Sequence, residues 1–232
     1  MINCTTPAGR PLGNASVRTV ALIYQAELTP SKPDVLTGWI PRQPWFEGDG
    51  GARVTILGSF RFDDPAGEVG IESFLVRFGA DSPTLHVPLT YRAEPLELGA
   101  GPVEPVATMQ HSVLGTRWVY DGARDPVYVA ALATAVLTGG TEAELRLPDG
   151  TELPARGAVR GSGSLAEAVG EPRRLAANEQ HPNTLLQTES FVVELRRVVG
   201  VTENPGDVTD PHLSGTWAGG DPALLAVVRP LG

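Results

Sequence analysis

The sequence predicts an α+β protein, a mostly antiparallel sheet that carries one principal helix and is followed by a small β-rich unit. Short segments of alternating apolar and polar residues recur along the chain, which indicates strands. The 27 Gly and 21 Pro residues punctuate these segments, which favours turns over long helices. One segment only has a complete helix signature. With 232 residues, 41% of them hydrophobic, the chain can build a substantial core.

The first half of the chain is expected to contain an N-terminal arm followed by several strands. Residues 17–28 read as one strand or a short helix inside an N-terminal arm. Residues 52–64 and 69–79 alternate and form a β-hairpin around a Pro-Ala-Gly-Glu turn, and residues 84–92 form a third strand. Pro88 lacks an N–H donor, so we expect an edge position or a bulge there. Residues 108–122 read as a strand pair that turns near Gly115.

The principal helix is expected over residues 125–140. Asp125 can cap its first turn, Pro126 suits the first helical position, and Gly139 and Gly140 end it. Its apolar residues Val129, Leu132, Ala133 and Val136 fall on one face, which should pack on the sheet.

The second half is expected to contain fewer elements. Residues 142–161 look like a hairpin that turns at Asp149–Gly150, and residues 161–172 look like a flexible connector. Residues 190–199 read as one strong strand, and residues 223–230 as a closing strand.

Composition excludes several classes of function. The net charge of −9 argues against nucleic-acid binding, which depends on clustered Lys and Arg. No apolar run approaches the ~20 residues that span a bilayer, and the first residues lack a signal-peptide core, so we expect a cytoplasmic protein that does not bind membranes. The single Cys4 cannot form an internal disulfide, which fits a reducing compartment.

Motifs for chemistry are weak. The four His residues show no metal-ligand spacing, and we expect neither a metal nor a cofactor. The segment RGSGSL at 160–165 matches neither a phosphate loop nor a nucleophile elbow and reads as a linker. Asp63 and Asp64 fall in a turn, where Asp is expected structurally. Arg196 and Arg197 could hold an anion, but strand alternation sends them to opposite faces, and a solvated surface is the simpler expectation.

Three ordered segments resemble a known family. LTGWIPRQPWFEGDG at 36–50, LHVPLTYRAEPLE at 85–97 and LGTRWVYDGARDPVYVAAL at 114–132 are similar to the N-terminal cap domain of actinobacterial maltokinase-like sugar kinases. The resemblance implies a cystatin-like cap, in which a curved sheet carries the 125–140 helix. It also implies that Trp39, Trp45 and Phe46 wedge the arm against the sheet, although aromatic residues among prolines would also suit a binding site.

A fainter resemblance continues after the cap. Residues 178–207 are similar to the start of the ATP-binding lobe of these kinases, but Val193 stands where the resemblance expects the phosphate-binding lysine. The single lysine of the chain is Lys32, ahead of the cap, and Pro182 lies in the loop that should cover the phosphates. No catalytic-loop motif follows.

The resemblance implies an N-terminal arm over 1–35, a cap over 36–140, a hairpin and linker over 141–177 and a degenerate kinase-lobe remnant over 178–232. We interpret the protein as a non-enzymatic interaction or regulatory partner in trehalose, maltose and α-glucan (glycogen) metabolism, bound to a maltose- or trehalose-processing enzyme or kinase. The alternative is a sensor that holds a sugar, sugar phosphate or nucleotide between cap and remnant. A homodimer through a free sheet edge stays open. The candidate ligand- or partner-binding residues are Trp45, Arg92, Trp118, Asp121 and Arg196.

Overall fold

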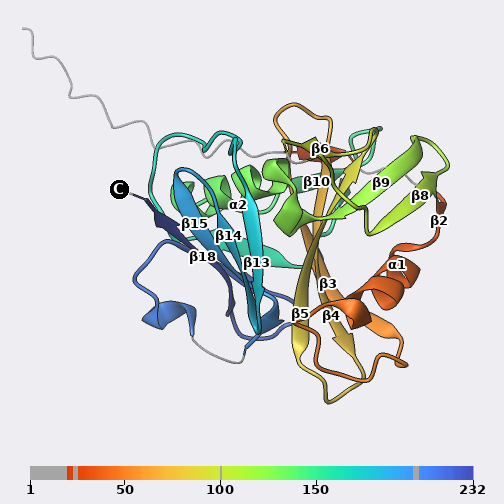
Figure 1. Ribbon diagram of the computed structural model, residues 1–232, viewed down its shortest axis with the longest axis horizontal. Helices are drawn as coiled ribbons and strands as arrows, with labels where there is room; N and C mark the ends of the chain where they lie inside the picture. Colours follow the sequence, from red (N-terminus) through yellow and green to blue (C-terminus); the bar gives the residue numbers. More distant parts are fainter. Residues whose placement is uncertain (1–19, 23–25, 100, 201–203, 232) are drawn as a thin grey trace, which may run out of the picture.

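Two large antiparallel sheets, two small sheets and two α-helices make up the part of the chain that the structure describes (Figure 1). The computed structural model describes residues 20–22, 26–99, 101–200 and 204–231. Most of the expected N-terminal arm, with Cys4, lies outside these residues. The α+β class and the mostly antiparallel sheet are therefore confirmed.

The first sheet, called the cap sheet here, has the order β2-β8-β9-β5-β4-β3, with β16 pairing with β5. Both expected hairpins and the third strand are confirmed, and Gly115 takes a positive φ of 74° as β9 begins. The strands are β2 Leu28–Thr29, β3 Val54–Phe62, β4 Gly70–Phe78, β5 Thr84–Arg92, β8 Ala107–His111, β9 Gly115–Asp121 and β16 Val198–Val199.

A short helix that the sequence did not predict, α1 (Lys32–Trp39), packs on one face of the curled cap sheet. Ser31 caps it by accepting a hydrogen bond from the backbone N–H of Asp34, and the 3₁₀ turn η1 (Ile40–Arg42), which contains Pro41, follows it. The segment after it folds back, so that Trp45 is fully buried beneath the sheet. Its ring meets Trp39 edge to face at 5.9 Å.

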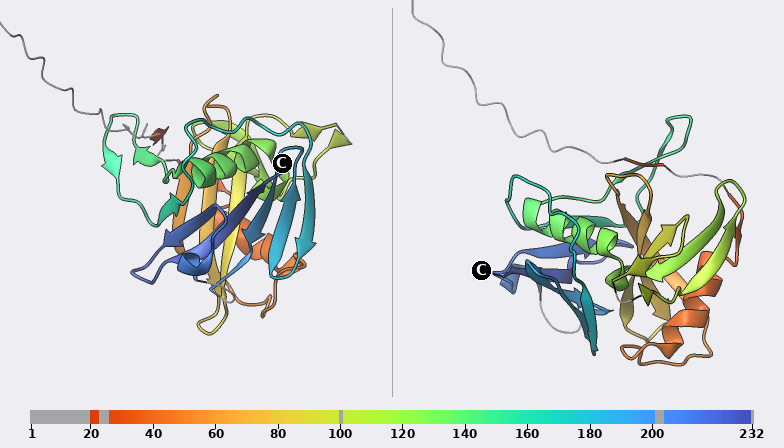
Figure 2. Two further views of the ribbon diagram at one scale, coloured as in Figure 1. Left: turned by 90° about the vertical axis from the view of Figure 1, so that its left-hand side faces the viewer. Right: turned by 45° about the horizontal axis from the view of Figure 1, so that its top comes forward.

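The second sheet, called the C-terminal sheet, has the order β12-β17-β18-β15-β14-β13. Its core is continuous with the opposite face of the cap sheet, so that the cap sheet lies between α1 on one side and α2 with the C-terminal sheet on the other (Figure 2). The strands are β12 Ala158–Gly161, β13 Ala176–Gln180, β14 Asn183–Gln187, β15 Phe191–Arg196, β17 His212–Thr216 and β18 Ala223–Pro230.

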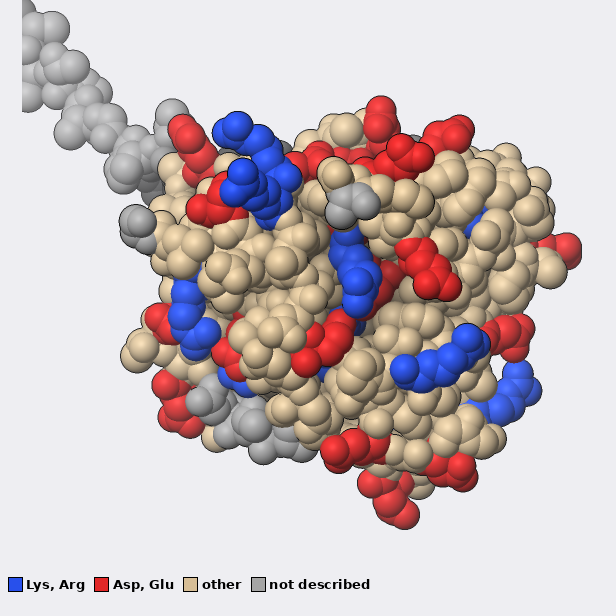
Figure 3. All heavy atoms as spheres, in the orientation of Figure 1, with Lys and Arg blue, Asp and Glu red and all other residues tan. Residues whose placement is uncertain are grey.

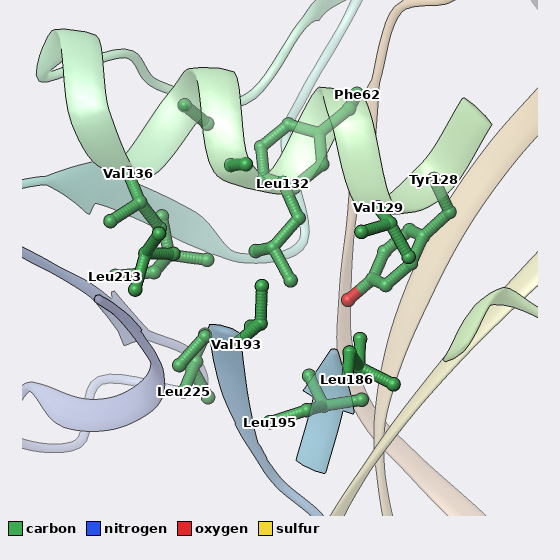
Figure 4. Packing of buried hydrophobic residues seen from close by; sticks show 14 of the residues in the cluster. Phe62, Tyr128, Val129, Leu132, Val136, Leu186, Val193, Leu195, Leu213 and Leu225 are labelled. Atoms are coloured by element: carbon green, nitrogen blue, oxygen red, sulfur yellow. The ribbon is translucent and has the colours of Figure 1, made fainter. Parts of the chain in front are cut away.

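The principal helix α2 (Pro126–Thr138) has the expected limits, because its signals are local. The Asp125 side chain accepts from the N–H of Val127, and Gly139 ends the helix with a φ of 70°. Its position differs from the expected one. Its apolar face packs mainly on the C-terminal sheet and only partly on β3 of the cap sheet (Figure 4).

The segment 161–172, expected to be a flexible connector, is bound along α2. The backbone N–H groups of Gly163 and Leu165 donate to the carbonyls of Val136 and Leu137, which satisfies the end of the helix. A Cβ on Gly161 would lie 1.9 Å from the carbonyl oxygen of Ala135, so only glycine allows this approach. The expectation of flexibility was therefore wrong, because these glycines serve packing and not mobility.

Residues 190–199 form two strands in two different sheets, and not one strand. β15 belongs to the C-terminal sheet, the chain turns at Arg197, and β16 pairs with β5 of the cap sheet. This also explains Pro88, which lies in an interior strand and not at an edge. It occupies the gap between the part of β5 that pairs with β16 and the part that pairs with β9.

The remaining elements are small. The hairpin expected over 142–161 is confirmed only in part: β10 and β11 form it, whereas residues 158–161 belong to β12 of the C-terminal sheet. β1 adds to β10 in parallel. These elements are β1 Val20–Leu22, β6 Glu97–Leu98, β7 Gly101–Pro102, β10 Glu144–Arg146, β11 Glu152–Leu153, and the 3₁₀ turns η2 Gly122–Arg124 and η3 Pro205–Asp207.

Candidate functional site

A buried ion pair joins the two sheets where the chain crosses between them. Arg197 Nη2 lies 2.6 Å from Asp121 Oδ2, and the two side chains are 0% and 4% exposed. Arg197 Nε donates to the hydroxyl of Thr184 at 2.8 Å, and the guanidinium lies 5.0 Å from the ring centre of Trp45. The pair therefore ties β9, β14 and the segment after α1 to one point, and we call it the junction pair.

A neutral histidine lies beside the junction pair. His86 on β5 is fully buried, and its backbone N–H donates to the carbonyl of Arg197. Burial and then the positive charge of Arg197 lower the pKa of His86 to about 3. The imidazole therefore stays uncharged at neutral pH and serves packing.

A second ion pair anchors α2 to the cap sheet. The guanidinium of Arg92 donates two hydrogen bonds, of 2.8 and 2.6 Å, to the carboxylate of Asp125. The hydroxyl of Thr90 donates a third, of 2.7 Å. Asp125 also caps the helix. These bonds assign Arg92 a structural role in positioning α2.

The five residues predicted from the sequence do not converge on one open site. Trp45 and Asp121 are brought together by Arg197, in the interior. Trp118 on β9 lies opposite Arg92 in the strand register and is half-buried. Arg196 is 7% exposed and lies 2.9 Å from Glu194.

The expectation that Arg196 and Arg197 are solvated was wrong. Both are buried, because the chain changes sheets between them and each guanidinium meets a carboxylate. A straight-strand pattern could not reveal this crossing.

A cavity among the described residues lies elsewhere, on the α1 side of the cap sheet. Its volume is about 420 Å³, and it extends from the β3–β4 turn to β8 and β9. None of the five predicted residues lines it. Its polar lining includes Lys32, Arg61, Asp63, Tyr91 and His111.

A charge cluster supports the wall of this cavity. The carboxylate of Glu72 accepts from Lys32 Nζ at 2.5 Å and from Arg61 Nη2 at 2.7 Å. Burial opposes ionisation of Glu72, but Arg61 and Lys32 outweigh burial and lower the pKa of the carboxyl. We call these three residues the cavity cluster.

Sequence reasoning missed the cavity cluster, although one signal pointed to it. Arg61 and Glu72 are direct cross-strand partners in the β3–β4 hairpin. An opposite-charge pair at facing hairpin positions is visible once the hairpin is aligned. Lys32 lies on a helix that the sequence did not predict.

The surface charge of the described residues is mixed. On the face shown in Figure 3, basic and acidic side chains are interspersed and form no continuous basic area. The described residues contain no group of three His, Cys, Asp or Glu side chains placed to hold a metal ion. In the same part of the chain, each helix is too short or too polar to cross a bilayer.

The fold and these contacts define an α+β protein in which a curled antiparallel sheet packs on a short helix. Residues 39–125 match the family model of the maltokinase N-terminal cap domain. The matched residues run from the last residue of α1 to the residue that caps α2 and make up less than half of the chain. The comparison with curated proteins gave no match.

Proposed function

We propose that this chain is a non-catalytic interaction component of maltose, trehalose and α-glucan metabolism of the actinobacterial type. In this role the cap domain binds a maltose- or trehalose-processing enzyme or kinase. The cap-domain match supports the link to maltokinases. The proposal that the chain is non-catalytic rests on the environment of Val193.

Val193 occupies the position at which the resemblance expects the phosphate-binding lysine. Its side chain is 0% exposed and points toward Leu132 of α2 (Figure 4). Since α2 covers this face of β15, a side chain here has no route to a nucleotide phosphate. Lys32 cannot replace the missing group, because it lies on α1 and is bound to Glu72.

The turn at Pro182, between β13 and β14, is also held within the protein by backbone hydrogen bonds. The carbonyl of Pro182 accepts hydrogen bonds from the N–H groups of Arg197 and Val198, both at 3.1 Å. A phosphate-covering loop needs N–H groups that point at the ligand. The junction around this turn is filled by Arg197, Asp121 and apolar side chains, so we do not extend the proposal to a sensor site there.

The tip of the β8–β9 hairpin is the surface that we assign to the partner. Val113 and Leu114 are 55% and 39% exposed and lie side by side in the chain. Adjacent exposed apolar residues on a hairpin tip are a common feature of protein-binding surfaces. Leu165, at 55% exposed, lies in the segment bound along α2 and offers a matched comparison.

The test uses purified proteins. A maltokinase and a trehalose-processing enzyme are each titrated with the full chain in calorimetry, and we expect binding by one of them with a Kd of about 10 μM or tighter. Val113→Glu should weaken this binding at least about tenfold, whereas Leu165→Glu should leave it unchanged. Loss of binding in both variants, or in neither, would remove the hairpin tip from the proposal.

The proposal that the chain is non-catalytic is tested separately, by an assay of ATP binding and phosphate transfer. The chain is incubated with Mg²⁺-ATP and maltose or glucose, and we expect neither sugar phosphate nor heat of ATP binding. Phosphate transfer by the unmodified chain would overturn the proposal, even if a partner bound.

A further inference from the structure

Neither residue of the junction pair lines the cavity on the α1 side of the cap sheet. The helix α1 and strands β2 and β8, which border it, lie on the same side of the protein (Figure 1). A volume of about 420 Å³ lies within the range of roughly 300–1,000 Å³ that is usual for small-ligand pockets. It is large enough for one or two sugar rings and too small for a protein segment with its own fold.

The wall offers more hydrogen-bond donors than the protein uses. The ammonium group of Lys32 has three N–H donors, and one of them is bound to Glu72. The guanidinium of Arg61 has five N–H donors, and it too donates to Glu72. The hydroxyl of Tyr91 is buried and has no hydrogen-bond partner among the described residues. A buried hydroxyl without a partner is costly, and a bound water or small molecule would satisfy it.

The wall also offers acceptors. Asp63 is partly buried in the cavity lining, and burial followed by the nearby charge of Asp64 raises the pKa of its carboxyl. The side chain of Asp64 is already bound by three backbone N–H groups of the turn, from Ala66, Glu68 and Val69. Asp63 is therefore a partly buried carboxylate of the lining that is available to a ligand, whereas Glu68 is exposed to solvent.

The charges of the lining balance, which argues against a charged ligand. Three cations and three carboxylates line the cavity, namely Lys32, Arg61 and Arg117 with Asp63, Asp64 and Glu68. Glu72 adds one further negative charge behind the wall. An anion would meet the carboxylates and a cation would meet the basic groups, whereas a neutral molecule with many hydroxyl groups could bond to both.

Apolar side chains complete the cavity. Leu28, Ile71 and Met109 line it, and the ring of Tyr91 adds an aromatic wall. Sugar rings present both hydroxyl groups and apolar C–H faces, and they pack on aromatic rings in this way.

We propose that this cavity binds a neutral saccharide of one or two rings, with Lys32, Arg61, Tyr91 and Asp63 as the hydrogen-bonding groups. The proposal goes beyond the interaction role and does not depend on it. Leu114 of the β8–β9 tip also lines the cavity, so partner binding is measured in the absence of sugar. The site lies on the α1 side of the cap sheet and not between the two sheets, and Lys32 contributes to it from outside the matched cap region.

The experiment is calorimetry and amide NMR with glucose, maltose and trehalose as neutral probes, and with gluconate as a charged probe. One neutral probe should bind with a Kd of about 0.1–1 mM, and gluconate at least tenfold more weakly. Shifted amide signals should lie at Lys32, Arg61 and Asp63, and not at Asp121 or Arg197.

Two variants separate ligand binding from folding. Tyr91→Phe removes only the hydroxyl and should weaken binding about five- to tenfold without lowering the melting temperature, because the hydroxyl has no protein partner to lose. Asp63→Asn should weaken binding about tenfold. Asp221→Asn, an exposed residue in a distant turn, should change neither property.

Three results would overturn the proposal. The first is no binding of any neutral probe at about 50 mM. The second is binding that Tyr91→Phe and Asp63→Asn leave unchanged. The third is tighter binding of gluconate than of every neutral probe, which would show an anion site.

Discussion

The junction pair and the cavity cluster each contain a buried carboxylate on the cap sheet, but they differ in what surrounds them. The junction pair, Asp121 with Arg197, is enclosed between two sheets and almost fully inaccessible. In the cavity cluster, Lys32 and Arg61 are 24% and 18% exposed, and both line a cavity. A closed ion pair fixes an arrangement, whereas a cluster beside a cavity keeps donors for a ligand.

Neutralising one carboxylate in each cluster should give the largest difference between the two clusters, measured as the loss in the free energy of unfolding. Asp121→Asn leaves the Arg197 charge buried without a counterion and should lower the free energy of unfolding by about 3–5 kcal/mol. Glu72→Gln should cost about 1–2 kcal/mol, because Lys32 and Arg61 can turn toward water in the cavity. Urea unfolding of the two variants measures both values. Equal losses would contradict the distinction.

Acid should destabilise the junction through His86. The pKa of His86 is about 3 in the folded protein and near its ordinary value of 6.5 in the unfolded chain. The unfolded state therefore binds a proton that the folded state does not, so the stability that is complete above pH 6.5 falls as the pH decreases toward 3. The loss should be about 1.4 kcal/mol per pH unit from this residue.

The variant His86→Leu tests this assignment. Neither ring nitrogen of His86 has a side-chain hydrogen-bond partner among the described residues, so leucine loses no such bond. We expect a much flatter pH dependence of stability between pH 6.5 and 5. An unchanged slope would assign the acid sensitivity to other groups.

The glycines along α2 test how the C-terminal sheet is held. Gly161→Ala places a methyl group against the carbonyl of Ala135 and should cost about 2–3 kcal/mol, measured by thermal unfolding. Gly170→Ala, in the same segment, has no heavy atom within 4 Å of the added carbon and is the control. It should change stability by less than about 0.5 kcal/mol. Similar effects of the two variants would mean that the segment is not closely packed.

The smallest expected effect is on the cavity side. Tyr91→Phe in the ligand-free protein should leave the free energy of unfolding within about 0.5 kcal/mol or raise it, since a buried unpaired hydroxyl is removed. A loss above about 1 kcal/mol would reveal a structural hydrogen bond and would weaken the case for a ligand.

The sequence predicted elements whose signals are local. Asp125, Pro126 and Gly139 define α2, and alternation with an intervening turn defines the β3–β4 hairpin. The helix α1 was missed because it is short and contains Pro33 and Gly38, both poor helix formers. Its formation depends on packing against the cap sheet.

The charged clusters could be predicted only in part. Asp121 was a candidate from the family resemblance, but its partner Arg197 becomes buried because the chain passes from one sheet to the other. That crossing is a tertiary event without a local signal. The cavity likewise collects side chains such as Lys32, Asp63 and Tyr91 from distant segments, and no spacing in the sequence reveals it.

Residue-resolved hydrogen exchange tests the central claim most directly, namely that the junction pair makes the cap sheet and the C-terminal sheet one cooperative unit. The slowest amides of β4 and of β18 should exchange with the same free energy of opening, equal to that of global unfolding. In the Asp121→Asn variant, the free energies of opening of the two sheets should differ. A difference above about 2 kcal/mol in the unmodified protein would contradict the claim, because the sheets would then open independently.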